Sequence, residues 1–166
     1  MPAIAQRITP FLWFDDQAEE AVAFYTSIFK NSTVLSTARY TPEAARAAGR
    51  PANSVMVVSF QLDGQAFTAL NGGPIFKFNE AVSLVVHCQS QKEVDYYWSR
   101  LSEGGDPKAQ QCGWLKDRFG LSWQVVPERS MELLTDPDHE KGRRVMAAIL
   151  EMKKIDVAGL ERAAAG

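Results

Sequence analysis

The sequence AVSLVVHCQSQKE, residues 81–93, predicts a strand that runs directly into a capped helix. Apolar residues alternate through its first half, as they do in a half-buried strand. Ser90 then stands three residues before Glu93, the capping-box spacing in which the serine accepts a hydrogen bond from the helix and the glutamate reaches back to the cap. The stretch 9–19 repeats this order, with Asp16 in the place of Ser90. The chain therefore predicts two related halves.

Beyond the two helix starts, the sequences of the two halves predict the same further elements. Apolar residues follow each cap at helical spacing, and short β-type runs separated by turns follow each helix. We therefore expect a βαβββ unit in each half. The fold class expected is α+β, with two βαβββ modules forming curved mixed sheets around a cavity and a C-terminal helical extension. The strands expected after the helices are 33–40, 55–62 and 65–70 in the first half, and 108–111, 114–116 and 121–126 in the second.

Turn residues mark the boundaries of these modules. The two modules are expected at about 8–71 and 80–127, joined by a glycine-containing connector. Residues 1–127 are therefore expected to contain both modules. Residues 128–166 are expected to be helical and to belong to the same domain. An alanine-rich insertion at 41–54 has no counterpart in the second half, and its role stays open. Its Thr41 cap and following proline predict a short helix.

Composition narrows the class of partner. The 166 residues are 46% hydrophobic and 23% charged, with a net charge of −2, the balance of an ordinary globular protein. Basic residues do not cluster with aromatic ones, which argues against nucleic acid. No apolar run approaches the roughly 20 residues of a membrane helix, and the first residues lack a secretory signal, so a cytoplasmic protein without a membrane partner is expected. In that reducing compartment Cys88 and Cys112 are expected to be buried thiols.

Strand alternation then indicates which side chains face the cavity. Successive residues of a strand point to opposite faces of its sheet, so one set should pack on the helix and the other should face the space between the modules. In residues 81–88 the more apolar set is assigned to the helix, which leaves Ser83 and His87 facing the cavity. The residues expected to pack on the helix are Val82, Leu84, Val86 and Cys88.

Superposing the two halves extends this assignment to other strands. Aligning the helix caps places Thr9 opposite Ser83, and aligning the turn glycines 64 and 120 places Thr68 opposite Gln124. Four neutral oxygen-bearing groups are thus expected around one cavity, where a ligand would satisfy them. The alternative is that they are ordinary polar residues bonded to backbone or water. The residues predicted to bind a ligand are Thr9, Phe11, Trp13, Thr68, Ser83, His87, Ser122 and Gln124.

The paired modules resemble the vicinal oxygen chelate superfamily, which includes glyoxalase I, extradiol dioxygenases and fosfomycin resistance proteins. Within it the chain is most similar to PhnB-like proteins, a family often described as 3-demethylubiquinone-9 3-methyltransferase. The resemblance spans nearly the whole chain, but it does not choose among the many chemistries of the superfamily. The stretches that carry it are 8–14, 21–25, 70–83, 112–127 and 152–156.

The resemblance also implies where a metal would sit. Enzymes of the superfamily hold a divalent metal with four ligands, and carrying those positions over reaches Thr9, Thr68, Ser83 and Gln124. Hydroxyls and an amide lack the charge and donor strength that zinc or iron needs, so no protein-held metal is expected. The strand-to-helix turns contain no glycine, which argues against a methyltransferase cofactor, and no cofactor is expected.

We therefore expect a PhnB-like protein that binds a small molecule in the cavity without a protein-held metal. One alternative is a small-molecule enzyme, glyoxalase-like or another lyase or transferase, that uses His87 or a metal recruited with the substrate; His87 is its candidate general base. Another is a non-catalytic dimerisation module. The resemblance implies a homodimer. The ligand and any reaction stay open.

Overall fold

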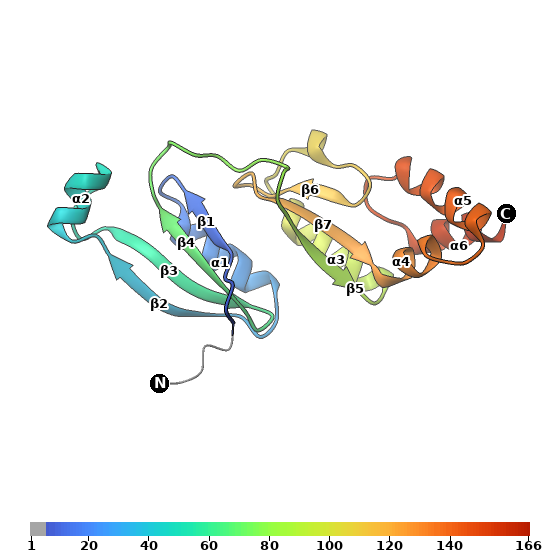
Figure 1. Cartoon of the computed structure of the whole chain (residues 1–166), viewed down its shortest axis with the longest axis horizontal. Coiled ribbons are helices and arrows are strands. Elements are labelled where there is room, and N and C mark those ends of the chain that lie inside the picture. Colours follow the sequence, from blue (N-terminus) through green and yellow to red (C-terminus); the bar gives the residue numbers. More distant parts are fainter. Residues whose placement is uncertain (1–5) are drawn as a thin grey trace. The chain divides into compact units, whose positions relative to one another are not determined.

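The computed structural model describes residues 6–166 of the chain (Figure 1). Its contacts divide the chain into two compact units, the first ending at Phe78 and the second running from Asn79 to Gly166. Each unit contains one sheet and at least one helix packed on it, as the internal repeat predicts. The α+β fold class and the helical C-terminal region are confirmed.

The first unit is a βαβββ module with one inserted helix. Its sheet has the order β1-β4-β3-β2, in which β1 pairs parallel with β4 and the other neighbours are antiparallel. The inserted helix is capped by Thr41, as predicted, and ends at a left-handed Gly49. The elements are β1 (Phe11–Phe14), α1 (Ala18–Ile28), β2 (Thr33–Arg39), α2 (Pro42–Ala48), β3 (Val55–Leu62) and β4 (Gln65–Asn71).

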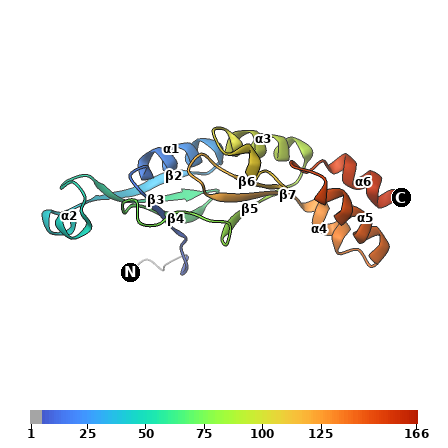
Figure 2. The same ribbon diagram turned by 90° about the horizontal axis from the view of Figure 1, so that it is seen from above.

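Helix α1 covers one face of this sheet (Figure 2). Its buried residues follow the predicted helical stripe, with Val22 and Tyr25 almost completely enclosed. They pack on alternate residues of the central strands, among them Phe60 and Phe67, whose rings stack at a centroid distance of 5.6 Å. Among residues 6–78, no helix packs on the opposite face of the sheet.

The start of α1 differs from the prediction. The cap residue is Gln17, which makes no side-chain cap bond, and the expected Asp16 box does not form. Instead the side chain of Asn71, at the end of β4, accepts a hydrogen bond from the Ala18 N–H at 2.8 Å. Its amide also donates to Glu19 Oε1 at 2.7 Å. A distant strand end therefore satisfies the helix terminus, which local spacing does not reveal.

The second unit contains a shorter module and three further helices. Its sheet has the order β5-β7-β6, with β5 parallel to β7 and β6 antiparallel to it. The predicted capping box forms here: Ser90 Oγ accepts from the Glu93 N–H at 3.2 Å. The elements are β5 (Ser83–Cys88), α3 (Gln91–Ser102), η1 (Pro107–Ala109), β6 (Trp114–Lys116), β7 (Ser122–Pro127), α4 (Glu128–Leu134), α5 (His139–Leu150) and α6 (Val157–Ala165).

Two details of the predicted second module are wrong. No strand forms at 108–111. The 3₁₀ turn η1 begins at Pro107 and overlaps this segment, because Asp106 accepts from the Lys108 N–H and Pro107 has no N–H to give to a sheet. Only an isolated bridge joins Gln111 to Trp114. Val82 precedes β5 and is exposed, so it does not join the helix-packed face, whereas Val86 and Cys88 do.

The C-terminal helices have an apolar core of their own, built around Leu133, Val145 and Leu160. They are tied to the loop before β6, since the Cys112 N–H donates to Met152 O at 2.8 Å and the Gly113 N–H donates to Lys153 O at 2.7 Å. The segment from residue 128 therefore packs as part of the second unit. Within residues 6–166, no helix is long and apolar enough to cross a membrane.

Candidate functional site

The two sheets repeat the same register, so the superposition of the halves is correct at this level. Phe11 of β1 lies opposite Thr68 of β4, and Val85 of β5 lies opposite Gln124 of β7. Aligning the helix caps makes Phe11 correspond to Val85, and aligning the turn glycines makes Thr68 correspond to Gln124, so these equivalent residues occupy equivalent places in their sheets. In each unit the predicted residues therefore share the sheet face opposite to its first helix.

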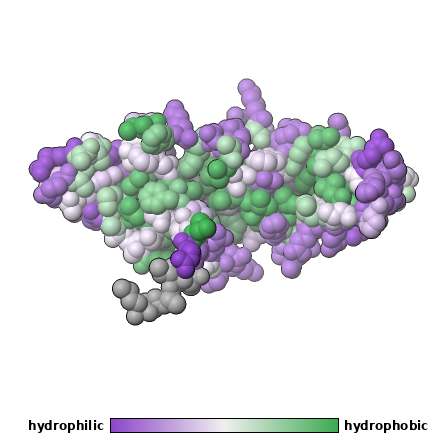
Figure 3. Space-filling model, viewed as in Figure 1, coloured by the Kyte–Doolittle hydropathy of each residue, from purple (hydrophilic) through white to green (hydrophobic). Residues whose placement is uncertain are grey.

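On the first sheet the predicted residues are not equally placed for ligand contact. Thr68 is half-buried beside Phe11, whose side chain is 58% exposed. Thr9 is exposed and lies two residues before β1. Hydrophobic residues lie over the strands on this face, as the space-filling view shows (Figure 3).

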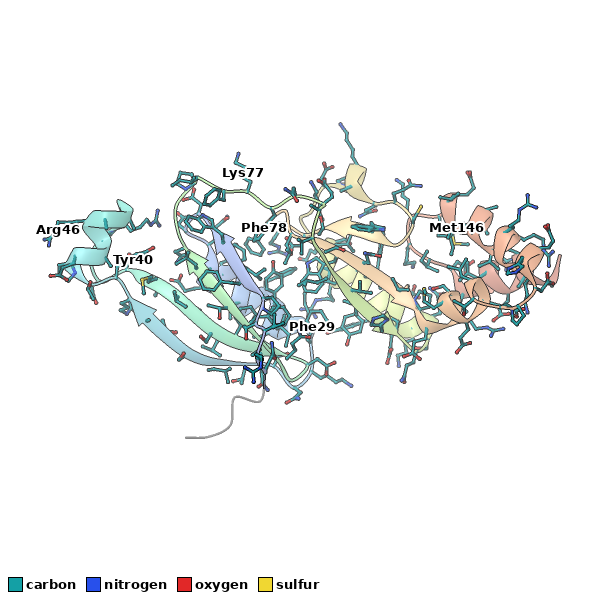
Figure 4. The ribbon with its side chains drawn as sticks, viewed as in Figure 1. Phe29, Tyr40, Arg46, Lys77, Phe78 and Met146 are labelled. Atoms are coloured by element: carbon teal, nitrogen blue, oxygen red, sulfur yellow. The ribbon has the colours of Figure 1, made fainter. Side chains whose placement is uncertain are left out.

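Trp13 is held by its own unit. Its indole Nε1 donates to Gly73 O at 2.9 Å, and its ring meets Phe76 edge-on at a centroid distance of 4.9 Å. A side chain on Gly72 would come within 2.3 Å of the same ring. Within the first unit, Trp13 therefore anchors the segment after β4, whose Lys77 and Phe78 are labelled in Figure 4.

On the second sheet, Ser83 and Gln124 are brought together. Gln124 Nε2 donates to Ser83 Oγ at 2.9 Å, so these two polar groups satisfy one another across β5 and β7. His87 is exposed farther along β5, opposite Val126. The pocket described below does not include His87.

The second unit contains a pocket of about 340 Å³ on this face. Strands β6 and β7 supply its floor, and the loop that carries η1 supplies a wall. Of the predicted ligand-binding residues, Ser122 lines it; Trp114 lies on the same sheet face, since it is opposite Gln124. The lining residues are Glu80, Ala109, Gln111, Cys112, Trp114, Leu115, Lys116 and Ser122.

The Ser122 hydroxyl is the unusual group in this pocket. The residue is only 1% exposed, and its Oγ has no hydrogen-bond partner within the described part of the chain. Trp123, the next residue, points the other way and gives its indole N–H to Asp117 at 2.9 Å. A buried hydroxyl without a partner costs about 1–3 kcal/mol, so a ligand that bonded to Ser122 would recover part of this cost.

An ion pair lies at the pocket, between Glu80 in the segment before β5 and Lys116 at the end of β6. Sequence analysis missed both residues. The side-chain hydrogen bond from Lys116 lowers the pKa of the Glu80 carboxyl. Strand alternation signals Lys116, because it lies two residues after Trp114 and opposite Ser122. No repeating pattern in the sequence indicates that Glu80 belongs to the site.

Both cysteines are free thiols, as predicted, but only one is buried. Cys88 is enclosed, and desolvation, with a smaller contribution from Glu93, raises the pKa of its thiol to about 12. It is a neutral core group. Cys112 is half-buried, lines the pocket and accepts a weak hydrogen bond from Gln111 Nε2 at 3.4 Å.

The residues present do not fit the divalent metal that the superfamily resemblance implies. On the second sheet the two transferred positions are the hydroxyl and amide of Ser83 and Gln124, already bonded to each other. Neither provides charge to a cation. Among residues 6–166, no group of three or more histidine, cysteine, aspartate or glutamate side chains is arranged to hold a metal ion.

A methyltransferase cofactor fits no better. The turns from β1 to α1 and from β5 to α3 lack the glycines that let such a cofactor approach the backbone. The helix N-termini are also engaged, because Asn71 accepts from the first N–H of α1 and Ser90 accepts from α3. We therefore assign no reaction step to a methyltransferase cofactor.

The chain is similar to one family model and to several solved structures. The model described as 3-demethylubiquinone-9 3-methyltransferase matches residues 6–126. A PhnB protein from Bacillus cereus is 34% identical, with a TM-score of 0.62 over 74% of this chain and 99% of that chain. No curated protein matches.

Two more distant structures share the fold. Protein PA1353 from Pseudomonas aeruginosa is 22% identical, with a TM-score of 0.57 over 75% of this chain and 98% of its own. The fosfomycin resistance protein FosX from Listeria monocytogenes is 16% identical, with a TM-score of 0.54 over 80% of this chain and 99% of its own. The chain thus belongs to the 3-demethylubiquinone-9 3-methyltransferase family of PhnB-like proteins and has the vicinal oxygen chelate fold.

Proposed function

We propose that this protein binds a small organic molecule in the pocket of its second unit, without a metal held by the protein. The observation that carries this proposal is the buried, unpartnered hydroxyl of Ser122 in that pocket. Binding sites for small molecules combine apolar walls with a few placed polar groups. The pocket has this composition.

The pocket is suited to a compact ligand. Its volume of about 340 Å³ lies at the small end of the roughly 300–1,000 Å³ usual for such sites. Trp114 offers an aromatic surface, and Ala109 is apolar. The polar groups are few: Ser122, Gln111 and the Glu80–Lys116 pair.

Replacing Ser122 with alanine should separate binding from stability. Because the hydroxyl has no protein partner, Ser122→Ala should leave the melting temperature of the free protein unchanged or slightly higher. It should weaken a ligand that bonds to the hydroxyl by roughly 5- to 10-fold, equivalent to about 1–1.4 kcal/mol. Thermal-shift screening with small aromatics and organic acids, followed by calorimetry on the hits, measures both.

Ser59→Ala is the matched control, since Ser59 is a half-buried strand serine of the first unit. It should leave the affinity of every hit unchanged. A screen in which no compound raises the melting temperature would contradict the proposal, because a ligand of the native state must stabilise it. Hits whose affinity is the same for Ser122→Ala and the wild type would place the site elsewhere.

We also propose that the chain forms a homodimer, as the family resemblance implies. Sedimentation equilibrium at micromolar concentration should then give twice the 18.4 kDa mass of one chain. A single species at the mass of one chain across the concentration range would refute this.

A further inference from the structure

We propose that the pocket selects monocarboxylic acids with an apolar or aromatic body, and that Glu80 occupies their carboxylate position until a ligand displaces it. This inference rests on the proposed function, because it assigns a chemical class to the ligand of the same pocket. It adds a charge preference and an internal competitor, and each can be tested separately.

The carboxylate position is defined by two neighbouring donors. Lys116 on β6 and Ser122 on β7 lie directly opposite each other in the antiparallel pair. Both residues line the pocket. Side chains at opposed positions on one face of a sheet are close enough to bind one group together. An ammonium and a hydroxyl in this arrangement match the two oxygens of a carboxylate, which accepts hydrogen bonds only.

Glu80 shows that the Lys116 end of this position accepts a carboxylate, while the Ser122 hydroxyl stays unpartnered. Its side chain reaches Lys116 from the irregular segment before β5 and forms an ion pair there. The Glu80 side chain is 65% exposed, whereas that of Lys116 is only 27% exposed. The cation therefore belongs to the pocket wall, and its partner is a surface group. Such exposed pairs contribute little to stability, so a ligand carboxylate can replace Glu80 at low cost.

The rest of the lining decides the body of the ligand. Trp114 lies two residues before Lys116 on the same strand and so on the same face. Ala109 and Cys112 add apolar surface around it. A phosphate monoester would bring about two negative charges to a pocket with one lysine and one free hydroxyl, and its other oxygens would lose water without finding donors. A ligand with a single carboxylate on a flat or apolar body matches the donors and the apolar surface of this pocket.

The test compares benzoate with its neutral analogue benzamide, by calorimetry, on the full-length wild type and three variants. Glu80→Gln removes the internal competitor and should raise the affinity for benzoate by about 3- to 10-fold. Lys116→Met removes the cation and should lower that affinity by about 10-fold or more. The affinity for benzamide should change by less than about twofold in both variants, because binding of a neutral ligand does not depend on the charge of Lys116.

Glu103→Gln is the matched control. Glu103 belongs to the same unit, its side chain is 66% exposed, and it pairs with Arg118 instead of with the pocket lysine. Its removal changes the net charge by the same amount as Glu80→Gln, so an equal gain in benzoate affinity in both variants would overturn the role of Glu80. Unfolding curves for each variant verify that the fold is intact.

The two proposals fail differently. If benzoate and benzamide bind equally and neither responds to Glu80→Gln or Lys116→Met, the carboxylate preference is overturned while small-molecule binding stands. If neither probe binds the wild type or Glu80→Gln, this inference is overturned, and the screen described above decides whether the pocket binds other compounds. Tighter benzoate binding in Glu80→Gln alone, with benzamide unchanged, supports the inference.

Discussion

Asp117→Ala should lower the free energy of unfolding by about 3–5 kcal/mol. Asp117 is 2% exposed. Its Oδ1 accepts from the backbone N–H of Phe119 at 2.8 Å and of Leu121 at 3.1 Å, and its Oδ2 accepts from the Trp123 indole at 2.9 Å. Alanine removes the acceptor of these three hydrogen bonds, two of which are buried.

The same substitution should abolish ligand binding in the pocket. Asp117 closes the turn that joins β6 to β7, and the residues that flank this turn are Lys116 and Ser122. The backbone also bridges the turn, since the Asp117 N–H donates to Leu121 O at 2.9 Å. When the carboxylate is lost, the relative placement of the two pocket donors is no longer fixed, so both stability and binding should fall.

Urea unfolding followed by tryptophan fluorescence measures the loss, and Asp106→Ala is the control. Asp106 is exposed and accepts one local hydrogen bond from the Lys108 N–H, so its removal should cost less than about 1 kcal/mol. Asp117→Asn should fall between the two, because an amide keeps one acceptor but turns a donor toward a donor. Equal curves for Asp117→Ala and Asp106→Ala would refute the anchoring role.

Local patterns were sufficient to predict the repeated modules. The capping box at Ser90, the alternation through β5 and the turn glycines each depend on residues within a few positions of one another. For that reason the correspondence between the two halves, such as Thr68 with Gln124, could be predicted, and the registers of the two sheets agree with it. The apolar stripes of α1 and α3 were predicted for the same reason.

Features that depend on distant contacts could not be predicted in this way. Asp16 has the spacing of a cap, yet Asn71 takes its place from another strand. The expected strand at 108–111 gave way to η1, because a local aspartate–proline turn satisfies the backbone there without a sheet.

The candidate site was predicted only in part. Ser122 was assigned to the ligand face from alternation alone, but its lack of a partner follows from the packing around it. Lys116 could have been found by extending the same alternation along β6. Glu80 could not, because it lies in an irregular segment before β5, where no strand or helix pattern indicates which way a side chain points.

Asn71→Ala should lower the free energy of unfolding by about 2–4 kcal/mol, because it removes a buried hub of the first unit. Asn71 is 4% exposed. Its Oδ1 caps α1 through the Ala18 N–H, and its Nδ2 donates to Val55 O at 3.1 Å as well as to Glu19. Its own carbonyl accepts from the Tyr40 hydroxyl at 2.6 Å, where β2 meets α2 (Figure 4).

The cost of this change should follow the loss of specific hydrogen bonds. Asn71→Asp keeps an acceptor at the helix N-terminus, where negative charge is favourable. It loses the donation to Val55 O and places a second carboxylate beside Glu19, so it should still destabilise the unit, by less than alanine does. Asn79→Ala is the matched control, since Asn79 is exposed and accepts one local bond from the Ala81 N–H. If chemical denaturation gave the same free energy of unfolding for Asn71→Ala and Asn79→Ala, α1 would not depend on β4 for its cap.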